Sequence, residues 1–97
     1  METTTVRVGD VGTLIEIDLT TDVSSAISRV IRARKPYGGI VEWPAAAGSS
    51  GEIITYTTQP GDLDRAGRWA LQALVEMPAG EWASEMVYID VYPVMQL

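Results

Sequence analysis

Short runs of alternating apolar and polar residues recur along this chain, and the clearest of them lies over residues 13–19. Ile15, Ile17 and Leu19 fall on one side of this run, whereas Leu14, Glu16 and Asp18 fall on the other. An alternation with a period of two residues is typical of a strand with one buried face. We therefore predict a half-buried strand here.

Further strands are predicted wherever a run of strand-forming residues is bounded by Gly, Pro or Asp. In the longest of them, Trp69, Leu71, Ala73 and Val75 make an inward row, and a turn at residues 78–81 leads into an antiparallel mate over residues 82–92. Turns spaced by about 8–12 residues are typical of a sandwich or barrel. Residues 45–51 are predicted to be a flexible loop. The remaining strands are expected over residues 6–8, 40–43 and 52–58.

Residues 22–35 are compatible with two structures. Val23, Ala26, Ile27, Val30 and Ile31 recur at helical spacing, and a helix begun at residue 22 would place its cations near its C-terminal end. The alternative is a turn at residues 21–25 followed by a strand. We favour the strand, because every other segment is predicted to be β and such domains seldom hold one long central helix.

The segment from residue 53 to residue 75 predicts a strand, an acidic turn and a second strand, which is the corner where a chain passes from one sheet to the other. Glycines at such a turn allow a positive φ or a close approach of the backbone, and aspartates can accept hydrogen bonds from turn N–H groups. Immunoglobulin domains place a Tyr at this corner, two residues before a Cys, and here Trp69 and Leu71 occupy those positions. The expected corner residues are Gly61, Asp62, Asp64, Gly67, Trp69 and Leu71.

Composition removes most kinds of catalytic chemistry. The 97 residues include no Cys and no His, which excludes thiol catalysis, disulfides and the commonest general base and metal ligand. Two Asp residues in the acidic turn are too few for a calcium loop. We expect no enzyme activity, no cofactor, no metal and no small-molecule ligand.

The net charge of −6 opposes nucleic-acid binding, which needs a basic surface. No apolar run is long enough to span a membrane, and residues 1–5 lack the features of a secretory signal. Four of the seven basic residues are nevertheless clustered, as Arg29, Arg32, Arg34 and Lys35. This basic strip predicts either a solvated strand face that protects a sheet edge or a contact with an acidic patch of a neighbouring subunit.

Both rows of the last predicted strand are apolar. Ala83, Val87, Ile89 and Val91 make one row. The other holds Met86, Tyr88, Asp90 and Tyr92, to which we add Trp82 and the tail of residues 94–97. Tyr, Trp and Met are enriched at protein interfaces, so we expect another chain to cover the second row. The alternatives are that this row faces the opposite sheet or that a long loop folds over it. The candidate interface residues are Arg29, Arg32, Arg34, Trp82, Met86, Tyr88 and Tyr92.

Three segments together resemble a known family. They are Val11–Thr13 running into Asp18–Thr20, Arg34–Gly38, and Gly61–Gln72. In this order they are similar to the immunoglobulin-like domain at the N-terminus of the baseplate upper protein of tailed bacteriophages. The resemblance implies an immunoglobulin-like β-sandwich that docks onto a phage particle.

We therefore expect one domain over residues 1–97, an all-β antiparallel sandwich of about seven strands. Its expected role is that of a structural virion protein of tail, baseplate or neck, assembled in the host cytoplasm with other virion proteins and as a homo-oligomer or ring. Because the chain ends at Leu97 without a stem, a stand-alone component is expected. The alternative is an adhesin-like module that binds a carbohydrate or a receptor through an exposed Trp.

Overall fold

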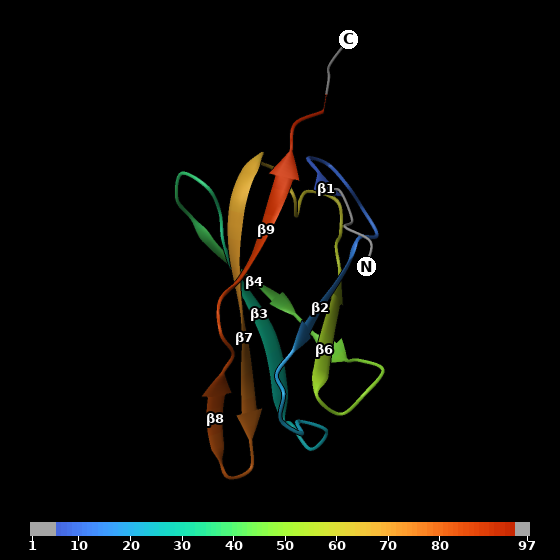
Figure 1. Cartoon of the computed structure of the whole chain (residues 1–97), viewed down its shortest axis with the longest axis vertical. Helices are drawn as coiled ribbons and strands as arrows, with labels where there is room; N and C mark the ends of the chain where they lie inside the picture. The colour runs from blue at the N-terminus through green and yellow to red at the C-terminus, as the bar shows by residue number, and fades with distance from the viewer. Residues whose placement is uncertain (1–5, 95–97) are drawn as a thin grey trace.

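Nine strands and no helix make up residues 6–94, the part of the chain that the computed structural model describes (Figure 1). The predicted all-β class is confirmed, with more strands than expected. No helix in this part of the chain is long and apolar enough to cross a membrane. The strands are β1 (Val6–Arg7), β2 (Leu14–Asp18), β3 (Ser28–Arg34), β4 (Ile40–Pro44), β5 (Ala46–Ala47), β6 (Ile53–Thr57), β7 (Gly67–Met77), β8 (Gly80–Ala83) and β9 (Val87–Tyr92).

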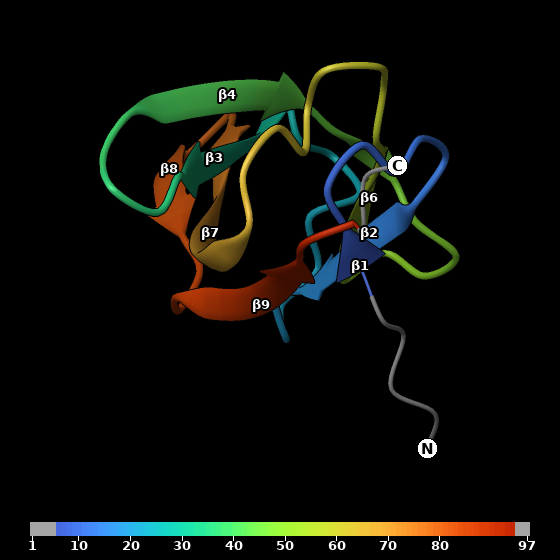
Figure 2. The same ribbon diagram turned by 90° about the horizontal axis from the view of Figure 1, so that it is seen from above.

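The strands form two sheets. The larger has the order β1-β9-β7-β3-β4, with β8 also paired to β7, and the smaller has the order β2-β6-β5. Seen from above, β4, β3, β7, β8 and β9 of the larger sheet curve along one side of the molecule, and β2 and β6 lie on the other, with β1 beside them (Figure 2). The prediction of purely antiparallel pairing is wrong at one place, because β1 pairs with β9 in parallel.

One hydrophobic core draws on both sheets. The smaller sheet contributes Ile15, Ile17 and Ile54, which are at most 8% exposed. The larger sheet contributes the predicted inward row of β7, Trp69, Leu71, Ala73 and Val75, which is confirmed as buried. The alternation predicted for β2 is also confirmed, since Leu14, Glu16 and Asp18 are exposed.

The strand interpretation of residues 22–35 is confirmed. The chain turns at residues 23–26, where the N–H of Ala26 donates to the carbonyl of Val23. It then enters β3, which pairs with β7 on one side and with β4 on the other. The hydrogen bonds of two long-range ladders satisfy the backbone N–H and C=O groups of this segment. They outweigh the local preference for a helix that the spacing of its apolar residues indicates.

Two segment predictions are wrong. The mate of β7 is not one strand over residues 82–92 but two, β8 and β9, both paired to β7. Ser84 lies at the break, where its Oγ accepts from the N–H of Ala73 and its carbonyl accepts from the side chain of Gln72. The predicted loop at residues 45–51 contains β5, a strand of the smaller sheet that pairs with β6.

Candidate functional site

The acidic corner passes from β6 in the smaller sheet to β7 in the larger sheet, as predicted. Asp62 accepts two hydrogen bonds there, one from the backbone N–H of Gln59 at 2.7 Å and one from the Tyr56 hydroxyl. Its predicted turn-capping role is therefore confirmed. Asp64 acts differently, because its carboxylate accepts from the Lys35 ammonium at 2.8 Å. That ammonium lowers the pKa of Asp64.

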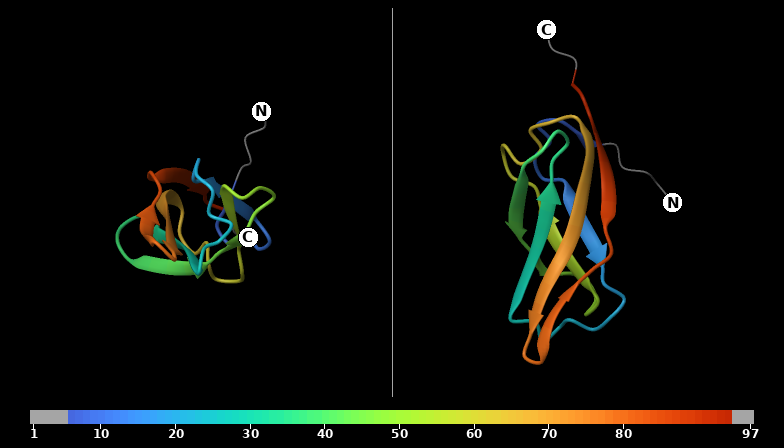
Figure 3. Two further views of the ribbon diagram at one scale, coloured as in Figure 1. Left: turned by 90° about the horizontal axis from the view of Figure 1, so that it is seen from below. Right: turned by 90° about the vertical axis from the view of Figure 1, so that its left-hand side faces the viewer.

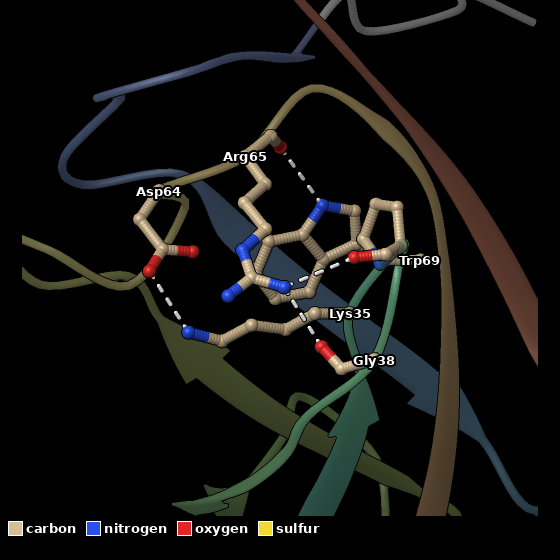
Figure 4. A network of polar contacts seen from close by, with 6 residues as sticks. Lys35, Gly38, Asp64, Arg65 and Trp69 are labelled. Carbon is tan, nitrogen blue, oxygen red and sulfur yellow. Dashed lines mark hydrogen bonds and ion pairs between the residues drawn. The ribbon is translucent and has the colours of Figure 1, made fainter.

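The corner is tied to the β3–β4 turn, which lies far from it in sequence (Figure 4). The Arg65 guanidinium donates to the carbonyls of Pro36 and Gly38, at 3.1 and 2.8 Å. At Gly67 the backbone has a φ of +129°, and an added Cβ would lie 2.8 Å from the Pro36 side chain. Segments 34–38 and 61–72, which carry most of the resemblance described above, therefore pack against each other.

Trp69 holds this corner on the core. Its side chain is fully buried, and its Nε1–H donates to the carbonyl of Arg65 at 3.0 Å. Its ring lies 6.1 Å from that of Trp43, which stacks in turn on Tyr56 at 5.0 Å. Such aromatic pairs stabilise by about 0.5–1.5 kcal/mol beyond the area they bury. Leu71, which follows on the same face of β7, is also fully buried.

Alkaline solution is expected to weaken the fold through Tyr56. Burial, with the hydrogen bond to Asp62 and its negative charge, raises the pKa of Tyr56 from 10.0 to about 12. Its contribution to stability is therefore fully present below pH 10 and is lost as the pH rises through 12. A shift of this size corresponds to about 1–3 kcal/mol. Urea melts of the wild type between these pH values should show the loss, and Tyr56→Phe should lack it. Equal losses in both proteins would contradict this prediction.

The outward face of the larger sheet, which Figure 3 (right) views from the front, is the candidate interface. Residues paired across neighbouring strands share one face of a sheet. The pairing therefore arranges this face in rows that cross the strands. The upper row is Tyr88, Ala70, Arg34 and Ile40, the central row is Gln72, Arg32 and Glu42, and the apolar row is Ala83, Leu74, Val30 and Pro44.

The structure divides the predicted basic strip. Arg32 and Arg34 lie on the outward face, where Arg32 pairs with Glu42 at 2.7 Å. Arg29 lies on the inward side of β3, and its guanidinium donates to the carbonyls of Val23 and Ser24. Its Nε is buried and has no hydrogen-bond partner among the described residues. Lys35 turns to the corner. The prediction of a sheet edge is wrong, because β3 lies between β7 and β4, whereas Arg32 and Arg34 do lie on an exposed strand face.

The predicted row of the last strand is brought together only in part. Tyr88 and Tyr92 lie on the outward face of β9 and are 56% and 50% exposed. The Arg68 guanidinium lies 6.0 Å from the Tyr88 ring centre and pairs with Asp90 at 3.0 Å. The Asp90 carboxylate raises the pKa of Arg68.

Met86 and Trp82 lie apart from this row. Met86 is 44% exposed and falls between β8 and β9. Trp82 is half-exposed and lies opposite Val75 on β7, out of line with Tyr88, and both Trp82 and Val75 line the groove described below. Of the tail, Val94 is exposed and residues 95–97 lie outside the described residues.

A groove of about 440 Å³ crosses the lower half of the outward face. It is lined by most of the apolar row, Ala83, Leu74 and Val30, and by the Arg32–Glu42 pair. Glu76 and Glu81 line its lower end. Of the groove residues, sequence reasoning named only Arg32 and Trp82 as interface candidates. It missed the others, because each is an isolated position on its own strand and only the pairing of β8, β7, β3 and β4 joins them.

Within residues 6–94 no three Asp, Glu, His or Cys side chains gather in a way that could hold a metal ion. The outward face instead offers exposed aromatic and aliphatic side chains, arginines and glutamates, which are groups suited to contact with another macromolecule. No protein-family model matches the chain, and neither a curated protein nor a solved structure matches it.

Proposed function

We propose that this chain is an immunoglobulin-like β-sandwich that acts by protein–protein assembly, as a structural component of a tailed-phage virion. The observation that carries the assembly role is the outward face of the larger sheet. There Tyr88 and Ile40 are 56% and 61% exposed, and the same face carries a groove lined by Val30, Leu74 and Ala83 together with charged side chains. Exposed apolar side chains gathered on one face of a small domain mark an interaction surface.

The strand order supports the immunoglobulin-like architecture. In such domains strands A, B, E and D form one sheet and C, F and G the other, with C′ added beside C in variable-type domains. Here β2, β6 and β5 match B, E and D, while β4, β3, β7 and β9 match C′, C, F and G. Trp69 also matches the corner tyrosine of that fold, because its polar hydrogen binds a carbonyl four residues upstream.

The virion role is supported by the three segments that resemble the phage baseplate domain, two of which pack against each other at the corner. In this proposal the protein is assembled in the host cytoplasm into a tail, baseplate or neck. It acts through burial of surface against other virion proteins, with no catalytic step.

Native mass spectrometry of the chain, co-expressed with the proteins encoded beside its gene, tests this function. We expect a complex of fixed stoichiometry with at least one neighbour. Tyr88→Glu should weaken it at least tenfold, because it places a charge on the proposed interface. Leu14→Glu is the matched control, since Leu14 is equally exposed but lies on the smaller sheet. A chain that binds none of these proteins contradicts the proposal.

A carbohydrate- or receptor-binding module is the second candidate. It is favoured by Trp82, which is 50% exposed and lines the groove together with charged Arg32 and Glu81. An indole can stack on a sugar ring while polar side chains bind its hydroxyls. Saturable binding on a glycan array that Trp82→Ala abolishes would favour this function over assembly.

A further inference from the structure

We infer that Tyr37, at the tip of the β3–β4 turn, is a preformed anchor that enters an apolar pocket rimmed by carboxylates on a partner protein. This inference rests on the proposed assembly function and states the chemistry of the partner surface. Among the large hydrophobic side chains of residues 6–94, that of Tyr37 is the most exposed, at 96%.

The backbone at Tyr37 has a conformation that a tyrosine rarely adopts. The N–H of Gly38 donates to the carbonyl of Lys35 at 3.2 Å, which closes a β-turn over residues 35–38. Pro36 stands at the second position of this turn, and Tyr37 has a φ of +65° at the third. These are features of a type II turn, whose third position requires a positive φ and usually holds Gly or Asn. A bulky residue at that position is strained.

The fold gains almost nothing from the Tyr37 ring in return for this strain, because the side chain lies almost wholly in solvent. Thr20 is the other non-Gly residue of the described chain with a positive φ, at +56°. Its conformation has a local explanation, since its N–H donates to the Asp18 carboxylate at 2.8 Å and its hydroxyl to the carbonyl of Leu19 at 2.7 Å. Strained residues concentrate at functional sites, and Tyr37 is the strained residue that contacts within the fold do not explain.

The turn is nevertheless held firmly on both sides of Tyr37. The Arg65 guanidinium donates to the carbonyls of Pro36 and Gly38, at 3.1 and 2.8 Å (Figure 4). A strained conformation persists only where surrounding contacts impose it. These hydrogen bonds therefore keep the turn in the conformation that exposes the ring before a partner arrives. Such preorganisation reduces the entropy that is lost on binding.

The charges around the tip specify the partner surface. Arg34 and Arg65 are exposed and make no ion pair within residues 6–94, while Lys35 balances the charge of Asp64. The tip is therefore basic, although the chain as a whole carries a charge of −6. Because potentials match across an interface, a fitting pocket has carboxylates at its rim and an apolar interior for the ring. Tyr and Arg are also among the residues that most often dominate binding energy.

A protein suits this tip better than an anionic membrane does. The acidic remainder of the chain would be repelled by anionic lipids. The tip also continues the proposed assembly surface, because Arg34 and Ile40 lie opposite each other in the upper row of the outward face. A partner that covers this row can therefore reach Tyr37 as well.

The Kd for the neighbour protein that native mass spectrometry identifies tests the inference. Tyr37→Gly removes the ring and places at this turn position the residue that it favours, so the Tm should rise or stay within about 4 °C of the wild type. The Kd should nevertheless rise at least tenfold. Arg34→Glu should also raise the Kd at least tenfold, because it places a carboxylate against the acidic rim.

Thr20→Gly is the matched control. It relieves a positive φ in the connection between β2 and β3, which enters β3 at the end far from the turn. The Kd of this variant should equal that of the wild type. An equal loss of affinity in Thr20→Gly and Tyr37→Gly would overturn the inference, because the loss would then not come from the ring.

Four further results would also overturn it. They are a wild-type Kd for Tyr37→Gly, a wild-type Kd for Arg34→Glu, a Tm of Tyr37→Gly that falls by more than about 4 °C, and binding to vesicles of phosphatidylserine and phosphatidylcholine that Tyr37→Gly abolishes. A complex that is weakened by Tyr88→Glu but not by Tyr37→Gly overturns the anchor and leaves the proposed function intact. A chain that binds none of its neighbours contradicts the proposed function, and the anchor with it.

Discussion

Replacing Trp69 with alanine is expected to destabilise the protein by about 3–5 kcal/mol, the usual cost of emptying a buried aromatic position. Trp69 is fully buried between the two sheets and stacks with Trp43. Its removal also leaves the carbonyl of Arg65 without the N–H that binds it. Urea melts monitored by far-UV circular dichroism measure the loss.

Trp69→Phe is the control for the ring alone. It keeps an aromatic side chain in the core and removes the hydrogen bond to Arg65, so the expected loss is about 1–2 kcal/mol. A loss below ~1 kcal/mol for Trp69→Ala would mean that this side chain does not hold the two sheets together.

Gly67→Ala is expected to cost about 2–4 kcal/mol. Two effects add at this position. The φ of +129° strains any residue with a Cβ, and the added carbon would lie 2.8 and 2.9 Å from the ring of Pro36. Gly67 is the first residue of β7. A backbone shift that relieves this clash would push the corner away from the β3–β4 turn and weaken the hydrogen bonds from Arg65 to the carbonyls of that turn.

Gly61→Ala separates the two effects. Gly61 has a φ of +87°, but an added Cβ there would have no atom within 4 Å. It should therefore cost only about 1–2 kcal/mol, the strain of a left-handed residue. Equal losses in the two variants would show that contact with Pro36 does not hold the corner.

The strands that could be predicted are those with a one-sided core face. Residues 15–19 alternate cleanly, and the inward row of residues 69–75 is apolar throughout. A register slip would move these apolar side chains into water. The corner was predictable for a similar reason, since glycines and aspartates in one short segment between strands indicate a turn. The ion pair of Asp64 with Lys35 was not predictable, because Lys35 lies in a turn that is distant in sequence.

The outward face was predicted only in part because a face belongs to several strands at once. Tyr88 and Arg34 were singled out from their own segments, but they lie in one row only because β9, β7 and β3 pair in a particular register. Trp82 was grouped with the wrong row, since the break at Ser84 separates β8 from β9 and leaves Trp82 out of line with Tyr88. Arg29 was grouped with Arg32, although alternation along β3 turns it inward.

Hydroxyl-radical footprinting of the assembled protein, compared with the dilute chain, tests most directly that the outward face of the larger sheet is covered by protein. Oxidation of Tyr88 and Ile40 should fall several-fold on assembly, whereas oxidation of Leu14, which is exposed on the smaller sheet, should fall much less. Tyr88 and Ile40 reacting as fast in the assembled protein as in the dilute chain would contradict the account.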